Sequence, residues 1–381
     1  MEQTIHRGLE GVNIDVSSIC HIDGAKGELI YRGYDIRELA NKATFEEVVH
    51  LLWEGELPTR AQLDAFKADI ARCFAVPQAV NDMLKALPRD VDPMHALTAA
   101  VALLGSLDPQ ADDTGLDNVK RIGKLLVGQF PTIVAGIQRV RQGLEPLAPH
   151  PDLGIAANFL YMLTGEEPTE AATNVMDVAL VLHAEHGSNA STFVARASAS
   201  TLTDVYSAIT AATATLKGPL HGGANEAVME ALEQIGSVEN VEAYVLDVLS
   251  RPGGRVMGFG HRVYRVLDPR AQVLKEVSRQ LAEESGDSKW FEMSLEMERV
   301  MEREMAKRGK QVRPNVDFFS ASVYRMLGFP AAMYTPIFAV ARIAGWMAHL
   351  YEQYADNKLM RPRLVYQGPR DKTFVPIDQR G

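Results

Sequence analysis

The spacing of apolar residues predicts helices over almost the whole chain. From Asp35 onward they recur at intervals of three and four, as in Phe45, Val48, Val49, Leu52 and Trp53. Thr44, followed three residues later by Glu47, has the spacing of a capping box, and Asp204 precedes another helical run. The most apolar stretch, 327–350, contains two prolines and an arginine, so we interpret it as a buried core helix preceded by a turn and not as a membrane span. The predicted fold class is all-α.

Residues 12–35 depart from this helical pattern. Two short β-prone runs, 12–16 and 29–31, are separated by Gly24 and Gly27, which are typical turn residues. We therefore expect a small antiparallel hairpin near the N-terminus.

Two glycine-rich stretches, 217–225 and 251–262, interrupt the helices. Glycine at this density packs no side chain, so we expect the backbone to approach a ligand there. Amphipathic segments of helix length lie between the two stretches. We predict a large domain over 1–219, a small domain over 220–325, and a return to the large domain with a C-terminal arm over 326–381.

Composition narrows the class of protein. The 381 residues carry a net charge of −10, with 46% hydrophobic and 23% charged residues, which is typical of a globular protein with a large core. Basic residues form no block, which argues against a nucleic-acid partner. Cys20 and Cys73 are too few for a disulfide framework or a cysteine-based zinc site, and the first eleven residues show no signal or transit peptide. We expect a cytoplasmic protein that binds no membrane.

Histidines near the glycine-rich stretches are candidate proton donors and acceptors at neutral pH. His221 and His261 lie within these stretches, while His183 and His186 have a spacing that places both on one helix face. A buried structural imidazole is the alternative for each of them. Zinc at 183–186 has no accompanying thiol or HExxH pattern, so no metal is expected.

Asp317 follows a Pro-Asn turn and precedes two aromatic residues. It has two interpretations: the N-cap of a helix that runs to Met326, or a general base whose pKa is raised by apolar surroundings. With the imidazoles of His221 and His261, it would complete a proton-transfer set.

The arginines suggest an anionic ligand. Arg342 is a lone charge in an apolar helix, so it must meet an acidic side chain or a carboxylate ligand. Arg270 and Arg361 offer further guanidinium groups that could bind a polycarboxylate in a bidentate manner, although each by itself is typical of a surface residue. Basic residues around the second glycine-rich stretch suit a phosphorylated ligand, with a solvated basic face as the alternative; they are Arg251, Arg255, Arg262, Arg265, Arg308 and Lys310.

Three motifs in order resemble the signature of the citrate synthase family: Gly218–Ala224, Gly258–Tyr264 with Asp268-Pro269-Arg270, and Pro314–Asp317. The opening run 27–36 and the helix 338–350 are also similar to that family, so the resemblance spans nearly the whole chain. It implies an all-helical homodimer with its active site in a cleft between a large and a small domain. It also implies the simple dimeric type, without the extra N-terminal region of the hexameric bacterial relatives that respond to NADH.

The resemblance implies a role for each candidate residue. Asp317 would remove a methyl proton from acetyl-CoA, His221 would donate a hydrogen bond to the thioester oxygen, and His261 would protonate the ketone oxygen of oxaloacetate. The citryl-CoA so formed would be hydrolysed. Oxaloacetate would be held by His186, Arg270 and Arg342, with Arg361 supplied by the neighbouring subunit.

Acetyl-CoA would be a co-substrate, and no tightly bound cofactor is expected. By the same resemblance, one loop would follow the adenine end of the coenzyme, with two basic residues near its phosphates. The loop is Arg255, Val256, Met257, Gly258 and Phe259, and the two basic residues are Arg265 and Lys310.

Two alternatives remain open at this stage. A 2-methylcitrate synthase, which uses propionyl-CoA, shares all three motifs, and one methylene discriminates by only about 1–3 kcal/mol. A non-catalytic helical module that binds acyl-CoA or a tricarboxylate belongs to another class. The set of His221, His261 and Asp317 argues against such a module, because binding alone needs no base.

Overall fold

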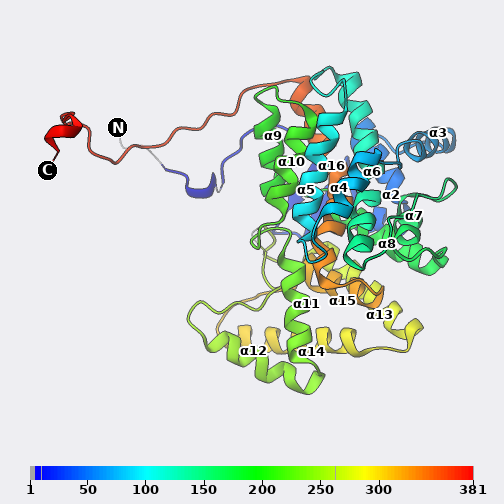
Figure 1. The fold of residues 1–381 in the computed structure, drawn as a ribbon. Coiled ribbons are helices and arrows are strands. Elements are labelled where there is room, and N and C mark those ends of the chain that lie inside the picture. The colour runs from blue at the N-terminus through cyan, green and yellow to red at the C-terminus, as the bar shows by residue number, and fades with distance from the viewer. Residues whose placement is uncertain (1–4, 10, 262, 381) are drawn as a thin grey trace.

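The computed structural model describes residues 5–9, 11–261 and 263–380, which form a helical protein with one small sheet (Figure 1). The predicted all-α class is confirmed. The α-helices are α1 (Ile36–Lys42), α2 (Phe45–Glu54), α3 (Arg60–Ala71), α4 (Gln78–Ala86), α5 (Pro93–Leu107), α6 (Leu116–Arg141), α7 (Ile155–Thr164), α8 (Glu170–His183), α9 (Ala190–Ala199), α10 (Val205–Leu216), α11 (Ala224–Ile235), α12 (Val241–Ser250), α13 (Pro269–Ser285), α14 (Lys289–Lys307), α15 (Val316–Met326) and α16 (Tyr334–Ala355). Short 3-10 helices are η1 (Arg7–Leu9), η2 (Val238–Asn240), η3 (Ala331–Met333) and η4 (Ile377–Gln379).

The N-terminal hairpin exists, but one of its strands was predicted at the wrong place. β1 (Cys20–Asp23), β2 (Glu28–Tyr31) and β3 (Tyr34–Asp35) form an antiparallel sheet in the order β1-β2-β3. The run 12–16 forms no strand, and its Val16 side chain is 87% exposed. The tight turn at 24–27 explains this result, because it returns the chain directly onto the residues that precede it. The N–H of Gly27 donates to the carbonyl of Asp23 at 2.9 Å.

The predicted helix signals are confirmed. Thr44 and Glu47 form a complete capping box at the start of α2, which satisfies two backbone N–H groups reciprocally. The Asp204 side chain accepts from the N–H of Ser207 and caps α10.

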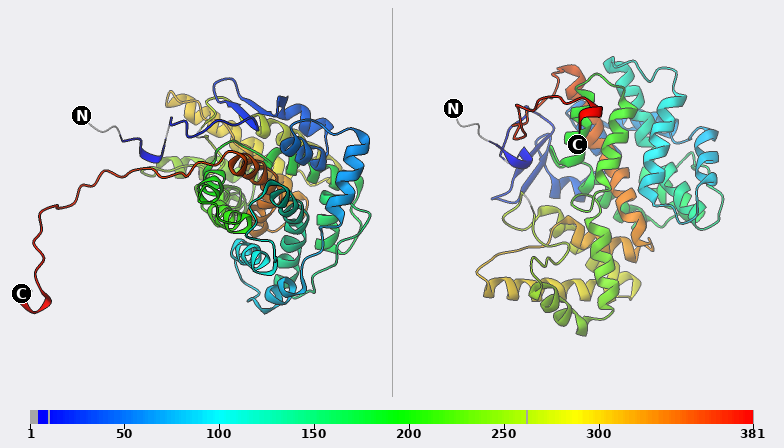
Figure 2. Two further views of the ribbon diagram at one scale, coloured as in Figure 1. Left: turned by 90° about the horizontal axis from the view of Figure 1, so that it is seen from above. Right: turned by 60° about the vertical axis from the view of Figure 1, so that its left-hand side comes forward.

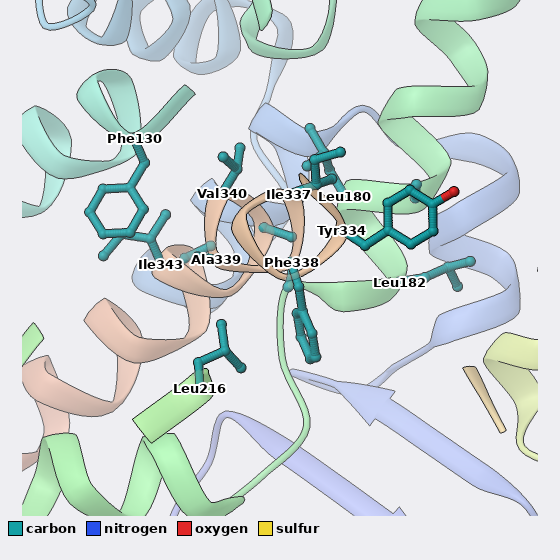
Figure 3. Close-up of a cluster of buried hydrophobic side chains, with 14 of the residues drawn as sticks. Phe130, Leu180, Leu182, Leu216, Tyr334, Ile337, Phe338, Ala339, Val340 and Ile343 are labelled. Atoms are coloured by element: carbon teal, nitrogen blue, oxygen red, sulfur yellow. The ribbon is translucent and has the colours of Figure 1, made fainter. Parts of the chain in front are cut away.

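The apolar stretch 327–350 contributes the buried helix α16, which packs against α2, α6, α8 and α9. Figure 3 shows apolar side chains such as Ile337, Phe338 and Val340 leaving this helix in different directions. A helix that is apolar on every side must be surrounded by other elements. Helix α16 is surrounded in this way. Within the described ranges no single helix has the length and hydropathy to cross a membrane; α15 joined to 331–355 meets those two criteria only as a pair bent by 118°.

Helices α11 to α15 lie together below the remaining helices in Figure 1 and contact one another. The division at 220–325 nevertheless stays a prediction. The sheet reaches this part of the chain, because the N–H of Arg265 donates to the carbonyl of Gly24 at 2.8 Å. A Cβ on Gly24 would lie 2.2 Å from the carbonyl oxygen of Val263, so only glycine permits this contact. Figure 2 shows η1 and the end of the chain after α16 lying away from the helices.

Candidate active site

The two histidines at the end of α8 have different surroundings. The prediction that His183 and His186 lie on one helix face is wrong, because α8 ends at His183 and His186 lies beyond it. His183 is fully buried, its Nδ1 donates to the carbonyl of Ala179 at 2.8 Å, and its ring packs 4.9 Å from that of Phe338. Burial lowers the pKa of His183 to about 3, so it is a neutral structural imidazole. His186 is 8% exposed, with Nε2 3.1 Å from the hydroxyl of Tyr264.

His261 is held by the backbone that follows it. The N–H groups of Val263 and Tyr264 lie 2.9 and 3.2 Å from its Nδ1 and donate to it. An accepting Nδ1 places the ring proton on Nε2. Burial, reinforced by the charge of Arg270, lowers the pKa of His261 to about 4, so the ring is neutral at pH 7. Its ring centroid lies 5.3 Å from that of His186.

The loop before His261 is hydrogen-bonded to the start of α15. The N–H of Asn315 donates to the carbonyl of Gly258 at 2.9 Å, and the N–H of Gly260 donates to the carbonyl of Arg313 at 2.9 Å. The Asn315 side chain also donates to the carbonyl of Gly260 at 3.0 Å. These bonds place the predicted coenzyme loop beside the N-terminus of α15.

Asp317 is the second residue of α15, and it is not the helix cap. The N-cap is Asn315, whose side-chain oxygen accepts from the N–H of Asp317 at 3.1 Å. The capping interpretation of Asp317 is therefore wrong. Its Oδ1 is buried and has no hydrogen-bond partner in the described part of the chain. Burial raises the pKa of Asp317 to about 7 despite the opposing charges of Arg270 and Arg342, so this carboxyl group can take up a proton near neutral pH.

His221 lies between α10 and α11, and it contacts a serine that the sequence did not indicate. The hydroxyl of Ser191 lies 2.7 Å from Nε2 of His221, and the N–H of Ser191 donates to the same atom at 3.3 Å. Because Nε2 accepts, the ring proton lies on Nδ1. The indole N–H of Trp346 donates to the Ser191 hydroxyl oxygen at 3.1 Å. Burial and the charge of Arg342 lower the pKa of His221 to about 4.

Arg270 and Arg342 are buried, so the surface interpretation of Arg270 is wrong. Arg270 forms a fork on Asp268, with Nε 3.1 Å from Oδ1 and Nη2 2.8 Å from Oδ2. Arg342 forms no ion pair with an acidic side chain among the described residues, although the charge of Glu185 opposes the lowering of its pKa by burial. Its Nε donates to the carbonyl of His183 at 2.9 Å, and its Nη2 is buried without a partner there. A guanidinium in this state is prepared for an anionic ligand.

The charges of the two arginines act on the remaining candidates. Charge effects on pKa come from groups a few ångströms away. At least one of the two arginines lowers the pKa of each of His186, His221, His261 and Asp317. Each of the four residues, from separate parts of the chain, is therefore within electrostatic reach of at least one of the two guanidinium groups.

Arg361 is not brought to this site by its own chain. Arg361 is exposed, and the N–H of the preceding residue, Met360, donates to the hydroxyl of Ser200 at the end of α9 at 3.0 Å. The chain beyond it extends away from the helices (Figures 1 and 2).

The predicted coenzyme residues divide by exposure. Arg255, Arg265 and Lys310 are exposed; Val256 and Gly258 are buried; Met257 and Phe259 are half-buried. Lys310 lines a surface pocket of about 360 Å³ together with Arg313. Arg262 lies outside the described residues, and in the rest of the chain no group of three or more His, Cys, Asp or Glu residues could hold a metal ion.

Sequence reasoning missed two polar groups that contact the candidate histidines. Ser191 had no local signal, because it lies 30 residues before His221. Tyr264 belongs to the second motif, and its proximity to His186, 78 residues earlier, depends on the fold.

Comparisons with known proteins agree with one another. The family model described as citrate synthase, C-terminal domain, matches residues 8–363. The chain is 48% identical to citrate synthase 2 of Bacillus subtilis, over 99% of this chain and 100% of that protein. A further relative, 2-methylcitrate synthase 1 of Corynebacterium glutamicum, is 40% identical over 100% of this chain and 99% of its own length.

A solved structure supports the same assignment. The ternary complex of citrate synthase from Thermoplasma acidophilum with carboxymethyl coenzyme A and oxaloacetate superposes with a TM-score of 0.94 at 35% identity, covering 100% of both chains. From its sequence, its fold and the residues gathered at its site, this chain belongs to the citrate synthase family.

Proposed function

We propose that this enzyme condenses acetyl-CoA with oxaloacetate and hydrolyses the resulting citryl-CoA to citrate and CoA. The names of the full-length relatives and the ligands of the Thermoplasma complex support this reaction. The observation that carries it is the carboxyl group of Asp317, which has a buried oxygen without a hydrogen-bond partner in the described ranges and a pKa of about 7. Two neutral imidazoles lie near the same pair of arginines, and a group with this pKa is suited to act as a base at neutral pH.

The first step is removal of a methyl proton of acetyl-CoA. Asp317 takes the proton, and Nδ1–H of His221 donates to the thioester oxygen, where negative charge develops. Ser191 supports this arrangement, because its N–H donates to Nε2 of His221 and so keeps the proton on Nδ1. The product is the enol or enolate of acetyl-CoA.

The second step forms the carbon–carbon bond. The enol carbon attacks the ketone carbon of oxaloacetate, and His261 gives its Nε2 proton to the ketone oxygen. The backbone N–H groups on Nδ1 of His261 hold the ring in the donating tautomer. Each such proton transfer contributes roughly 10²–10⁴-fold to the rate. Water then cleaves the thioester of citryl-CoA and releases CoA.

Oxaloacetate binding is assigned to His186, Arg270 and Arg342. The Nη2 of Arg342, which has no partner among the described residues, is the strongest support, because a buried cationic donor of this kind favours a carboxylate. Arg361 is proposed to come from the second subunit of a homodimer, which agrees with its exposed position beside Met360, whose N–H donates to Ser200 at the end of α9 that is remote from Ser191. A monomer would then bind oxaloacetate incompletely.

Coenzyme contacts are proposed for the loop 255–259, with Arg265 and Lys310 near the phosphates. The exposure of both basic side chains suits this role. Cytoplasmic location stays a prediction from cysteine usage.

A 2-methylcitrate synthase is the second candidate function, favoured by the 40% identical relative of that name. The two functions differ in the acyl chain, so the test is thiol release from acetyl-CoA and, separately, from propionyl-CoA, each with and without oxaloacetate. Release that depends on oxaloacetate, with the higher kcat/KM for acetyl-CoA, is the expected result. A preference for propionyl-CoA would favour the second candidate, and no release with either would refute both.

The base assignment has its own test. Asp317→Asn should lower kcat by about 10²–10⁴-fold while oxaloacetate binding, measured by calorimetry, persists. Asp112→Asn, which changes an exposed carboxylate, is the matched control and should keep wild-type turnover. Unchanged turnover in the Asp317 variant would remove this residue from the mechanism.

A further inference from the structure

Tyr264 contacts both imidazoles that the proposed function assigns to oxaloacetate. Its hydroxyl lies 3.1 Å from Nε2 of His186, and its backbone N–H donates to Nδ1 of His261 at 3.2 Å. Its ring lies 4.7 Å from the ring of His261 and 5.6 Å from that of His186. Tyr264 is 4% exposed, so these contacts are shielded from water.

The hydrogen-bond balance determines which atom donates. Among the described residues the Tyr264 hydroxyl has no hydrogen-bond partner other than His186. If Nε2 of His186 donated, the phenolic proton would be left without an acceptor in a buried site, which is unfavourable. The phenol therefore donates to Nε2, and the neutral His186 ring carries its proton on Nδ1.

The surroundings of His186 indicate which kind of ligand group its Nδ1–H would contact. Arg270 and Arg342 both lower the pKa of His186, after burial itself, so the ring is neutral and lies close to two cations. A dianionic ligand drawn by these guanidinium groups presents only acceptor oxygens. An Nδ1–H donor suits such a ligand, whereas a bare Nδ1 lone pair would repel it.

The position of Tyr264 is itself well supported. The following residue, Arg265, is hydrogen-bonded through its N–H to Gly24 in the β1-β2 turn at 2.8 Å. A Cβ on Gly27 would lie 2.9 Å from the Val266 side chain, which shows how closely the turn packs against this segment.

We propose that Tyr264 is a positioning residue that holds His186 with its proton on Nδ1, in the tautomer that donates to oxaloacetate. The inference rests on the proposed function and extends it, because it assigns the proton placement of the substrate-binding histidine to one hydroxyl group. One residue thereby orients both histidines, the first through its side chain and the second through its backbone.

The test compares Tyr264→Phe with Tyr354→Phe. The control also loses one phenolic hydrogen bond, from Tyr354 to the carbonyl of Thr203 at 2.6 Å, but at a place remote from the candidate histidines. Without its hydroxyl partner His186 samples both tautomers, and apparent affinity falls with the competent fraction. We expect the KM for oxaloacetate to rise about two- to tenfold in Tyr264→Phe, with the KM for acetyl-CoA and kcat nearly unchanged. Tyr354→Phe should leave all three at wild-type values.

A second measurement does not depend on turnover. In ¹⁵N-histidine-labelled wild-type protein, the His186 ring, assigned from the spectrum of His186→Gln, should show a protonated Nδ1 and an unprotonated Nε2. A protonated Nε2 would overturn the proposal even if the phenylalanine variant did not fold. An unchanged or lower KM for oxaloacetate in a folded Tyr264→Phe would also overturn it, since a lower value means that the hydroxyl competes with the substrate. If wild-type protein releases no thiol, the proposed function fails, whereas the tautomer measurement still decides what Tyr264 does to His186.

Discussion

Gly258→Ala should destabilise the protein through two separate effects. Gly258 has φ +80°, a region in which an alanine costs about 1–2 kcal/mol. A Cβ there would also lie 2.8 Å from Cδ2 of Phe318 and 2.8 Å from Cγ2 of Val228, which is too close for a real contact. Overpacking of this kind costs typically about 1–3 kcal/mol. The expected loss in the free energy of unfolding is therefore about 2–5 kcal/mol.

Gly253→Ala is the matched control in the same glycine-rich stretch. Gly253 has φ +70°, but a Cβ there would have no neighbour within 4 Å. Only the backbone cost of about 1–2 kcal/mol should appear. Urea unfolding at one protein concentration measures both variants, and the midpoint should fall further for Gly258→Ala at an unchanged slope.

Catalytic activity should also fall further in Gly258→Ala than in Gly253→Ala. The carbonyl of Gly258 accepts the N–H of Asn315, two residues before Asp317, and Phe318 follows Asp317 directly. Displacing this loop should therefore lower kcat/KM for acetyl-CoA more than Gly253→Ala does. Equal destabilisation by the two alanines would show that the loop can move away from α11 and α15 without cost, and would refute the reasoning.

Three further predictions concern titration and proton placement. The kcat/KM for acetyl-CoA should fall as the pH drops below about 7, because the pKa of Asp317 is raised to about 7 and only its ionised form is a base; a profile flat down to pH 5 would contradict this. Ser191→Ala removes the hydroxyl on Nε2 of His221 and should lower kcat about tenfold with the KM for oxaloacetate unchanged, as steady-state kinetics would measure; an unchanged kcat would argue against a role for this hydroxyl. Burial, followed by the charge of Glu46, raises the pKa of Asp177 in the folded protein above its unfolded value, so the contribution of this group to stability is fully present below about pH 4 and is lost as the pH rises toward neutrality. Asp177→Asn should therefore gain stability at pH 8 and little at pH 4 in urea unfolding, and equal gains at both would contradict the assignment.

Several features of the fold followed from short-range chemistry and could be predicted. The capping box of Thr44 and Glu47 and the cap at Asp204 involve residues three positions apart, so their signals are visible in the sequence. The buried helix α16 was predictable because its apolar residues cover every face. Where a local signal was ambiguous, prediction failed: Asn315 and Asp317 both suit a helix start, and the structure has Asn315 as the cap, with its N–H and its side chain also bonded to Gly258 and Gly260.

The candidate site likewise has features that could be predicted from the sequence and features that could not. Its residue types and motifs were predictable, because glycine-rich stretches, imidazoles and a carboxylate beside aromatic residues carry chemical meaning by themselves. The environment of each side chain was not. The hairpin and its turn glycines were predicted, but the pairing of residues 20–23 with 28–31 was not, and the separation of His183 from His186 required the exact end of α8.

The sequence by itself therefore determined the helical class, the family resemblance and the candidate residues, because these depend on periodicity, caps and motifs within a few positions. Only the tertiary structure decided which groups meet. Tyr264 reaches His186 across 78 residues, and Arg342 donates to the carbonyl of His183 across 159. Such contacts, and the burial that raises the pKa of Asp317 and lowers those of His221 and His261, arise from packing between segments that are distant in the sequence. Charge, dielectric and hydrogen-bond partners are properties of the space around a side chain.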